Sequence, residues 1–202
     1  MRKYSLNQDF FSVSNPESDY WAGFIAADGC ISKNNTTLHL GAKDAAHAQD
    51  FLNAVSTDRP LYVYPNGTVS ANISSRKIVA DLGNRYGITA RKTWTLRFPN
   101  LKDPLGFIAG YIDGDGCWDK HKIRGQNYDY LRLQIEGNQE FLASINSKLG
   151  GEGTVVIRSD RNSEHAYLRF VGMKAKRVDN LLSGLGRLSR KWYDREYRSL
   201  AS

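Results

Sequence analysis

Two aspartates, Asp28 and Asp115, end two similar segments of the chain, 21–29 and 108–116. Each segment is rich in small residues, has the pattern of a short helix, and ends in Asp-Gly. A helix that occurs twice, with a carboxylate at the same end, predicts two half-domains that meet at a shared acidic site. Mg²⁺ favours one or two carboxylates together with the phosphate oxygens of a substrate. The pair therefore points to metal-dependent chemistry on a phosphate ester.

The electrostatics of the two aspartates call for a counter-charge. The C-terminus of a helix carries partial negative charge, so each carboxylate stands at the unfavourable end. If the helices pair, the carboxylates also approach each other, and like charges raise each other's pKa unless cations neutralise them. We therefore expect divalent ions here. We also expect Gly29 and Gly116 to adopt the left-handed conformation that ends many helices.

Small residues along the two segments predict that the helices pack closely against each other. Gly23 and Gly110 lie in the middle of the expected helices, where glycine costs about 1 kcal/mol relative to alanine. Close approach of a second backbone would offset that cost. The other small residues that leave a smooth face are Ala22, Ala26, Ala27, Ala109 and Gly114. The alternative is that each helix packs only on its own sheet, and the two matching copies favour pairing.

The duplication extends to the elements that must position these helices. Alternating polar and apolar residues predict strands, and a helical period predicts helices. Asn66-Gly67 between two alternating runs predicts a hairpin. The expected strand regions are 32–43, 61–74, 119–136 and 153–171, and the expected helices beyond the two motifs are 44–55, 76–86, 138–149 and 175–185. Each half thus has the order αββαββα.

Pro99 and Pro104 mark the junction between the halves. We predict an N-terminal half-domain at 1–98, a linker at 99–105 and a C-terminal half-domain at 106–202. The expected fold class is α+β, with the halves related by a pseudo-twofold axis, as in a homodimer fused into one chain. Together they would form a curved antiparallel β-saddle around the two motif helices. The expected functional unit is a monomer with this internal pseudo-symmetry.

The composition indicates which kind of binding partner and which cellular location to expect. The net charge of +7 and the pI of about 9.4 favour a polyanionic partner, most often a nucleic acid. The chain has no long apolar run and no signal-peptide pattern, so we expect neither a membrane span nor secretion. Cys30 and Cys117 do not make a disulfide framework, and we expect them to be small, partly buried residues. These features predict a cytoplasmic or organellar-matrix location.

On these motifs the chain resembles the LAGLIDADG homing endonucleases in their single-chain, two-motif form. The resemblance covers nearly the whole chain, because the motif spacing and the strand–helix order also fit. It implies a site-specific double-strand DNA endonuclease associated with intron homing, in which Asp28 and Asp115 hold catalytic Mg²⁺, for which Mn²⁺ would substitute. We place the main chain of Ala27, Gly29 and Gly114 beside these ions.

The resemblance also implies a lysine near the active centre in each half, in a basic patch after the last helix. The matching residues are Lys92 and Lys191, each in a basic pair that is followed by a tryptophan. They would stabilise negative charge that develops at the phosphate, or position the attacking water. An earlier motif aspartate is present as Asp113 in the second copy but is Ala26 in the first. This departure predicts asymmetry between the halves.

Two carboxylates with bridging metal ions can supply what phosphodiester hydrolysis needs: an activated water, charge neutralisation at the phosphate, and stabilisation of the leaving oxygen. One aspartate from each half would give one site for each strand. No competing constellation is apparent in the sequence. The four histidines lack metal-ligand spacing, and the chain has neither a Cys-x-x-Cys motif nor a glycine-rich phosphate loop.

Alternating strands suit the reading of a DNA groove, because one face packs on helices while the other presents polar and basic side chains. Arg and Lys suit guanine edges and Asn and Gln suit adenine edges, while a share of such residues would instead hold phosphates. The candidate DNA contacts are Lys33, Asn34, Lys43, Tyr62, Tyr64, Asn66, Thr68, Ser70, Asn72, Arg76, Lys120, Lys122, Arg124, Gln126, Arg132, Gln134, Arg158, Arg161, Tyr167 and Arg169. A merely solvated polar face is the alternative for any one of them.

The main alternative function is a catalytically silent DNA- or RNA-binding protein of the same fold, such as an intron maturase or a transcription regulator. Such proteins often lose the motif acids, and both acids are present here, which favours the nuclease. A dual endonuclease and maturase, with RNA as a second partner, is also open. A housekeeping RNA-binding α/β protein has no support beyond the basic charge.

Overall fold

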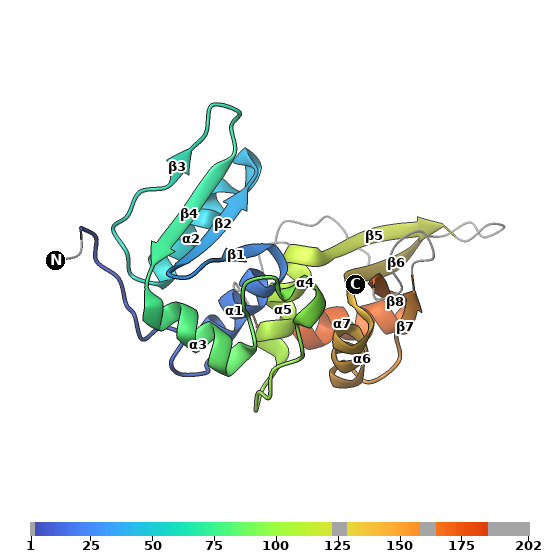
Figure 1. Ribbon diagram of the computed structural model, residues 1–202. Coiled ribbons are helices and arrows are strands. Elements are labelled where there is room, and N and C mark those ends of the chain that lie inside the picture. The colour runs from blue at the N-terminus through green and yellow to red at the C-terminus, as the bar shows by residue number, and fades with distance from the viewer. Residues whose placement is uncertain (1–2, 123–128, 158–164, 186–202) are drawn as a thin grey trace.

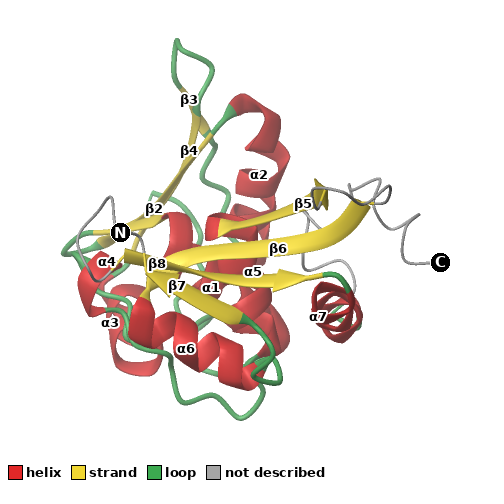
Figure 2. Ribbon diagram, turned by 90° about the vertical axis from the view of Figure 1, so that its right-hand side faces the viewer, coloured by secondary structure: helices red, strands yellow, loops and turns green. Residues whose placement is uncertain are grey.

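The computed structural model describes residues 3–122, 129–157 and 165–185. Over these ranges the chain runs twice through the predicted order αββαββα, and each pass builds a four-stranded antiparallel sheet (Figure 1). The two motif helices lie side by side at the centre of the molecule, between the sheets (Figures 1 and 2). The α+β architecture expected from the sequence is confirmed.

The first pass forms a sheet with the strand order β1-β2-β4-β3. Its elements are α1 (Pro16–Asp28), β1 (Gly29–Ile31), β2 (Asn35–Leu40), the 3-10 helix η1 (Ala42–Asp44), α2 (Ala45–Ala54), β3 (Tyr62–Val63), β4 (Val69–Ser74), α3 (Arg76–Tyr86) and the short helix α4 (Lys92–Thr95). The predicted hairpin turn joins β3 to β4, with Gly67 at a φ of 81°.

The second pass forms a sheet with the strand order β5-β6-β8-β7, which matches the first. Its elements are α5 (Leu105–Asp115), β5 (Gly116–Lys122), β6 (Asp129–Asn138), α6 (Gln139–Lys148), β7 (Thr154–Ile157), β8 (His165–Val171) and α7 (Met173–Ser183). Helix α5 begins at the last residue of the predicted linker. None of the described helices is long and apolar enough to cross a membrane.

Local sequence explains where the first motif helix begins. Asn15 caps α1, because its side-chain oxygen accepts hydrogen bonds from the backbone N–H groups of Glu17 and Ser18. The Ser18 hydroxyl in turn accepts from the Asn15 N–H, which completes a capping box. Pro16 suits the first helical turn, where its missing N–H is not needed.

Glycines allow the backbones of α1 and α5 to touch, as predicted. A Cβ on Gly23 would lie 1.9 Å from the Phe107 carbonyl oxygen, and a Cβ on Gly110 would lie 1.9 Å from that of Tyr20. No side chain fits at such distances. The approach is reciprocal, which gives the helix pair its near-twofold character.

Gly29 and Gly116 differ from the prediction. Their φ angles are −77° and −101°, in the extended region and not the left-handed one. Each glycine is also the first residue of a strand, so the chain passes directly from helix to strand without a left-handed cap. The need for glycine is steric, because a Cβ would lie 2.7 Å from the Ile25 carbonyl oxygen in the first copy and 2.4 Å from that of Ile112 in the second.

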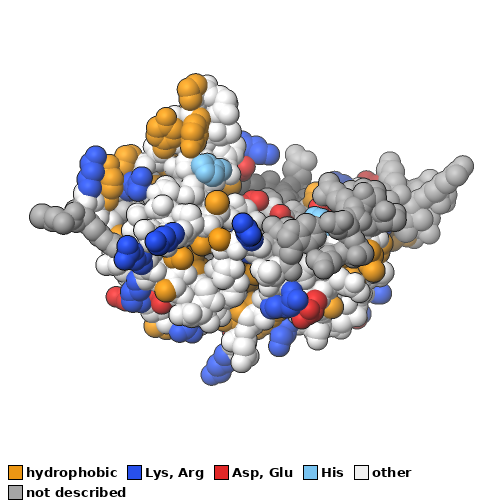
Figure 3. Space-filling model, in the orientation of Figure 1, with side chains coloured by type: hydrophobic (Ala, Val, Ile, Leu, Met, Phe, Trp, Pro, Cys, Tyr) orange, Lys and Arg blue, Asp and Glu red, His pale blue; other side chains and the backbone are white. Residues whose placement is uncertain are grey.

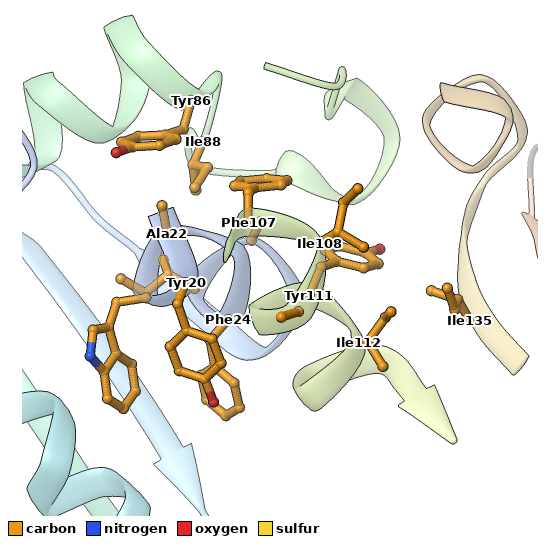
Figure 4. Packing of buried hydrophobic residues seen from close by; sticks show 14 of the residues in the cluster. Tyr20, Ala22, Phe24, Tyr86, Ile88, Phe107, Ile108, Tyr111, Ile112 and Ile135 are labelled. Atoms are coloured by element: carbon orange, nitrogen blue, oxygen red, sulfur yellow. The ribbon is translucent and has the colours of Figure 1, made fainter. Parts of the chain in front are cut away.

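The hydrophobic core joins the helix pair to both sheets. Helices α2 and α3 pack on the first sheet, and α6 and α7 pack on the second. Aromatic residues surround α1 and α5, with Tyr86 stacked on Phe107 at a centroid distance of 6.1 Å (Figure 4). In β8, buried Ala166, Leu168 and Phe170 alternate with half-buried residues. One face of the sheet therefore packs on helices, and the other carries the polar positions.

Candidate active site and nucleic-acid interface

The two motif aspartates lie at the same end of the helix pair. Gly106 near the start of α5 is close to Pro16 near the start of α1, and Gly114 near the end of α5 is close to Ala27 near the end of α1. The two helices therefore run parallel. Because Asp28 and Asp115 are their last residues, the fold brings both carboxylates to one place, as the duplicated motif predicts.

The two carboxylates have different surroundings. Asp28 is exposed, whereas Asp115 is half-buried. Burial, with repulsion from the Asp28 carboxylate as the second cause, raises the pKa of Asp115 to about 6. The nearby Lys92 ammonium and a hydrogen bond from Tyr111 act in the opposite direction. The site thus holds negative charge in a poorly solvated place.

Lys92 reaches this site from the first turn of α4. Its Nζ donates a hydrogen bond of 2.9 Å to the carbonyl oxygen of Ala27 in α1. Burial lowers the pKa of Lys92, while the charges of Asp115 and Asp28 partly counteract that shift. The predicted lysine and both predicted aspartates are therefore brought together. The carbonyl of Ala27, which we expected beside the ions, is the point where the lysine is anchored.

A cavity of about 260 Å³ opens beside Asp115. Besides Lys92 and Ala27, it is lined by Tyr111, Glu136 and His165. The Tyr111 hydroxyl donates a hydrogen bond of 3.0 Å to the Glu136 carbonyl oxygen, which ties α5 to β6. Our sequence analysis missed these three residues. Only Tyr111 left a signal, because it lies one helical turn before Asp115.

The donor set fits Mg²⁺. No group of three or more His, Cys, Asp or Glu side chains is placed to hold a metal ion within the described part of the chain. Two carboxylates suffice for Mg²⁺, which keeps several waters and uses phosphate oxygens as further ligands. A divalent cation would also relieve the repulsion that raises the pKa of Asp115.

Comparisons with known proteins give structural matches only. No protein-family model matches the chain, and no curated protein matches it in sequence. The I-SmaMI meganuclease bound to uncleavable DNA is 16% identical, with a TM-score of 0.67 over 93% of this chain and 89% of that one. The I-LtrWI LAGLIDADG homing endonuclease bound to target DNA is 13% identical, with a TM-score of 0.66 over 96% and 90%. The I-AabMI LAGLIDADG meganuclease bound to uncleaved DNA is 12% identical, with a TM-score of 0.66 over 93% and 90%.

The chain has the LAGLIDADG fold. The likeness extends over nearly the whole of each structure, so both halves take part in it. The resemblance drawn from the two motifs is confirmed at the level of the fold.

The LAGLIDADG motifs differ at the earlier acid, and the structure explains why. Asp113 is almost fully buried and accepts a hydrogen bond of 2.8 Å from the Tyr20 hydroxyl of the other motif helix. His47 in α2 lies 3.2 Å from the same hydroxyl. In the other copy Ala26 replaces the aspartate, and Phe107 replaces the tyrosine. The acid and the hydroxyl are thus both present at one crossing of the helix pair and both absent from the other, and Asp113 makes a buried hydrogen bond between the two helices.

Several predicted DNA contacts of the first LAGLIDADG half lie on the helix-free face of its sheet. The rings of Tyr62 and Tyr64 are in contact at 4.7 Å between centroids. The Asn72 side-chain amide donates a hydrogen bond of 2.6 Å to the Thr37 hydroxyl on the neighbouring strand. Ser70 has the same parity, but it is buried.

Other candidates of the first half lie in turns. The side-chain oxygen of Asn66 accepts hydrogen bonds from the backbone and hydroxyl of Thr68, so Asn66 closes the β3–β4 turn. Lys33 and Lys43 are exposed, in the β1–β2 turn and in η1. Arg76, the first residue of α3, links this helix to the β1–β2 turn. Its Nε donates a hydrogen bond of 3.1 Å to the side-chain oxygen of Asn34.

The second LAGLIDADG half places Arg132, Gln134, Tyr167 and Arg169 on the helix-free face of its sheet. Lys120 differs, because it is exposed but lies opposite Leu131 and so points to the other face of the sheet. The candidates Arg124, Gln126, Arg158 and Arg161 and the predicted active-site Lys191 lie outside the described residues, as does the side chain of Lys122.

The polar faces also hold residues that the sequence analysis did not select. Thr37 and His39 share the face of Asn72, and Asp119 shares the face of Arg132. Their period-two spacing along β2 and β5 was the available signal. Cys30 and Cys117 are exposed on these faces, which corrects the expected partial burial. The reason is parity, because each follows a buried or half-buried glycine at the start of its strand.

Proposed function

We propose that the chain is a site-specific double-strand DNA endonuclease that hydrolyses phosphodiester bonds with divalent ions, Mg²⁺ or Mn²⁺, held by Asp28 and Asp115. The observation that carries the proposal is the meeting of these carboxylates with the half-buried Lys92 at one end of the α1–α5 pair. The DNA-bound homing endonucleases that share the fold, and the net charge of +7, support a DNA substrate.

Each group at the site has a distinct role in this proposal. Asp28 and Asp115 would hold the ions, and the Tyr111 hydroxyl, which donates to the Glu136 carbonyl oxygen, lies beside Asp115. When bound, the ions would activate water and stabilise the leaving oxygen. The ammonium of Lys92, oriented by the Ala27 carbonyl, would stabilise the negative charge that develops on the phosphate.

The arrangement of the two halves fits a monomeric enzyme that cuts both strands. Each sheet presents a polar face, and each half contributes one aspartate to the centre between the sheets. One half would bind each side of the target, with the two carboxylates serving opposite strands. Intron homing is the biological role that such an enzyme would have.

The test is cleavage of a randomised duplex library by the purified chain. We expect discrete double-strand cuts with Mg²⁺, none with a chelator, and recovery when Mn²⁺ is added. A double variant, Asp28→Asn with Asp115→Asn, controls for contaminating nucleases. Selective binding without cutting by the wild type would replace the proposal with the silent binding protein of the same fold. A wild-type chain that neither binds nor cuts any duplex would overturn the proposal.

Replacing Lys92 with methionine should slow cleavage about 100-fold while leaving DNA binding intact. Methionine fills the half-buried site with an apolar chain of similar length but removes the ammonium group. The measurement is the single-turnover cleavage rate together with the affinity for uncut DNA. Lys174→Met, at an exposed position of α7, is the matched control and should cleave normally. An unchanged rate in Lys92→Met would remove the lysine from the site.

A further inference from the structure

We propose that the two sheets recognise half-sites of different base composition. The first sheet would read an A·T-rich half-site, and the second sheet a half-site with guanines opposite Arg132 and Arg169. This inference rests on the proposed function, because it specifies the DNA that the endonuclease would recognise. We call the helix-free face of each sheet its polar face.

The polar face of the first sheet carries no charged side chain. Strands β1 to β4 are all described, and the residues of that parity are Cys30, Asn35, Thr37, His39, Tyr62, Ser70, Asn72 and Ser74. None is Lys, Arg, Asp or Glu. Cations lie around the edges of this face, with Lys33 in a turn, Arg76 at a helix start and Arg59 beside the pocket that Ser74 lines, and basic side chains at such edges suit phosphates.

These side chains match A·T pairs better than G·C pairs. An Asn side chain can pair with the adenine edge, and the methyl of Thr or an aromatic ring can contact the thymine methyl. Tyr62 is 59% exposed, beside Tyr64. Figure 3 shows hydrophobic side chains gathered over the projecting β3–β4 hairpin. This exposed aromatic group offers an apolar contact to the thymine methyl.

The polar face of the second sheet differs, because two arginines on its central strands are held in fixed orientations. Arg169 in β8 donates from Nη2 to the side-chain oxygen of Gln134 in β6 at 3.1 Å. Its guanidinium lies over the ring of Tyr167 at 4.8 Å. Its Nε is buried and has no hydrogen-bond partner. An arginine fixed in this way loses little entropy when its planar fork meets the two acceptors of guanine.

Arg132 is held by an acid on the adjacent strand. Its Nε donates to Oδ1 of Asp119 at 2.8 Å, and its Nη2 pairs with Oδ2. This side-on pair fixes the plane of the guanidinium, and a planar fork held in one orientation matches the two acceptors of guanine. The carboxylate also disfavours a phosphate at this point by charge repulsion. A base edge is therefore the better partner for Arg132.

The experiment is selection of bound duplexes from a randomised library, with the full chain as wild type, Arg132→Lys and Arg169→Lys. Lysine keeps the charge but loses the fork, so contacts to phosphate would survive and guanine preference would fall. We expect the wild type to select guanines in one half-site only. Each lysine variant should lose about 10- to 100-fold of the preference at a single, different base pair. Arg177→Lys on α7, which alters an ion pair between Arg177 and Glu152, is the matched control.

Asp119→Ala tests whether Asp119 is a positioning residue for Arg132. It should reduce guanine preference at the base pair affected by Arg132→Lys and leave the Arg169 base pair unchanged. A purely structural role would lower binding to all sequences equally. Comparing the unfolding temperatures of all variants separates misfolding from altered recognition.

The outcomes distinguish this inference from the proposed function. A selected and cleaved site with equal guanine content in both halves would overturn the inference and leave the endonuclease standing. Unchanged base preference in both lysine variants would do the same. A library from which the wild type selects no sequence at all would overturn both.

Discussion

Asp28→Asn and Asp115→Asn will each reduce double-strand cleavage by on the order of 1,000-fold or more, because several kcal/mol of metal-dependent stabilisation are lost. Asparagine keeps the shape of the side chain and removes the charge that would hold a divalent ion. Binding of the uncut target should persist, since both residues lie at the centre and the polar faces of the sheets are untouched.

Asp28→Asn should also show that the two aspartates repel each other in the folded state. The pKa of Asp115 is raised to about 6 by burial and by the charge of Asp28. Removing the Asp28 charge lifts part of that repulsion, so Asp28→Asn should unfold at the same temperature as the wild type or slightly above it. Calorimetry without metal measures this directly.

Asp50→Asn is the matched control for these variants, because Asp50 is an exposed aspartate on α2. It should cleave and unfold like the wild type. Undiminished cutting by either Asp28→Asn or Asp115→Asn would contradict the assignment of the active site, even if the fold and the DNA binding were as proposed.

Gly110→Ala will destabilise the fold by about 3 kcal/mol or more. The new Cβ would lie 1.9 Å from the Tyr20 carbonyl oxygen, and the obstacle is backbone, which cannot rotate away as a side chain can. The helix pair must separate, and the aromatic core around it must repack (Figure 4). The measurement is the free energy of unfolding from a denaturant titration.

Gly83→Ala is the control, and it should change the free energy of unfolding in the opposite direction. Gly83 also lies within a helix, α3, but the nearest atom to its Cβ would be 3.9 Å away, at the Ile88 carbonyl oxygen. Alanine should therefore stabilise the fold by about 0.5–1 kcal/mol through its better helix propensity. If both alanine variants changed stability alike, close backbone approach would not be the reason for Gly110.

The sequence predicted the features that depend on local pattern and on repetition. The period of apolar residues predicted the αββαββα order, and the duplicated Asp-Gly endings predicted that Asp28 and Asp115 end two paired helices. The mid-helix glycines Gly23 and Gly110 predicted backbone contact between the helices. These predictions depend only on the local sequence of each half: the periodicity of its apolar residues, the spacing of its motif, and the free-energy cost of a glycine inside a helix.

Only the tertiary structure decided how residues from distant segments meet. Tyr20 and Asp113 are 93 positions apart, and their hydrogen bond exists because the helix pair brings them together. Asp119 faces Arg132 only through the register of β5 and β6. Gly29 proved to be extended, because a strand follows the helix at once. Register and helix packing are set by the whole core, so residue types and spacing determined which groups could act, and the assembled fold determined which of them meet.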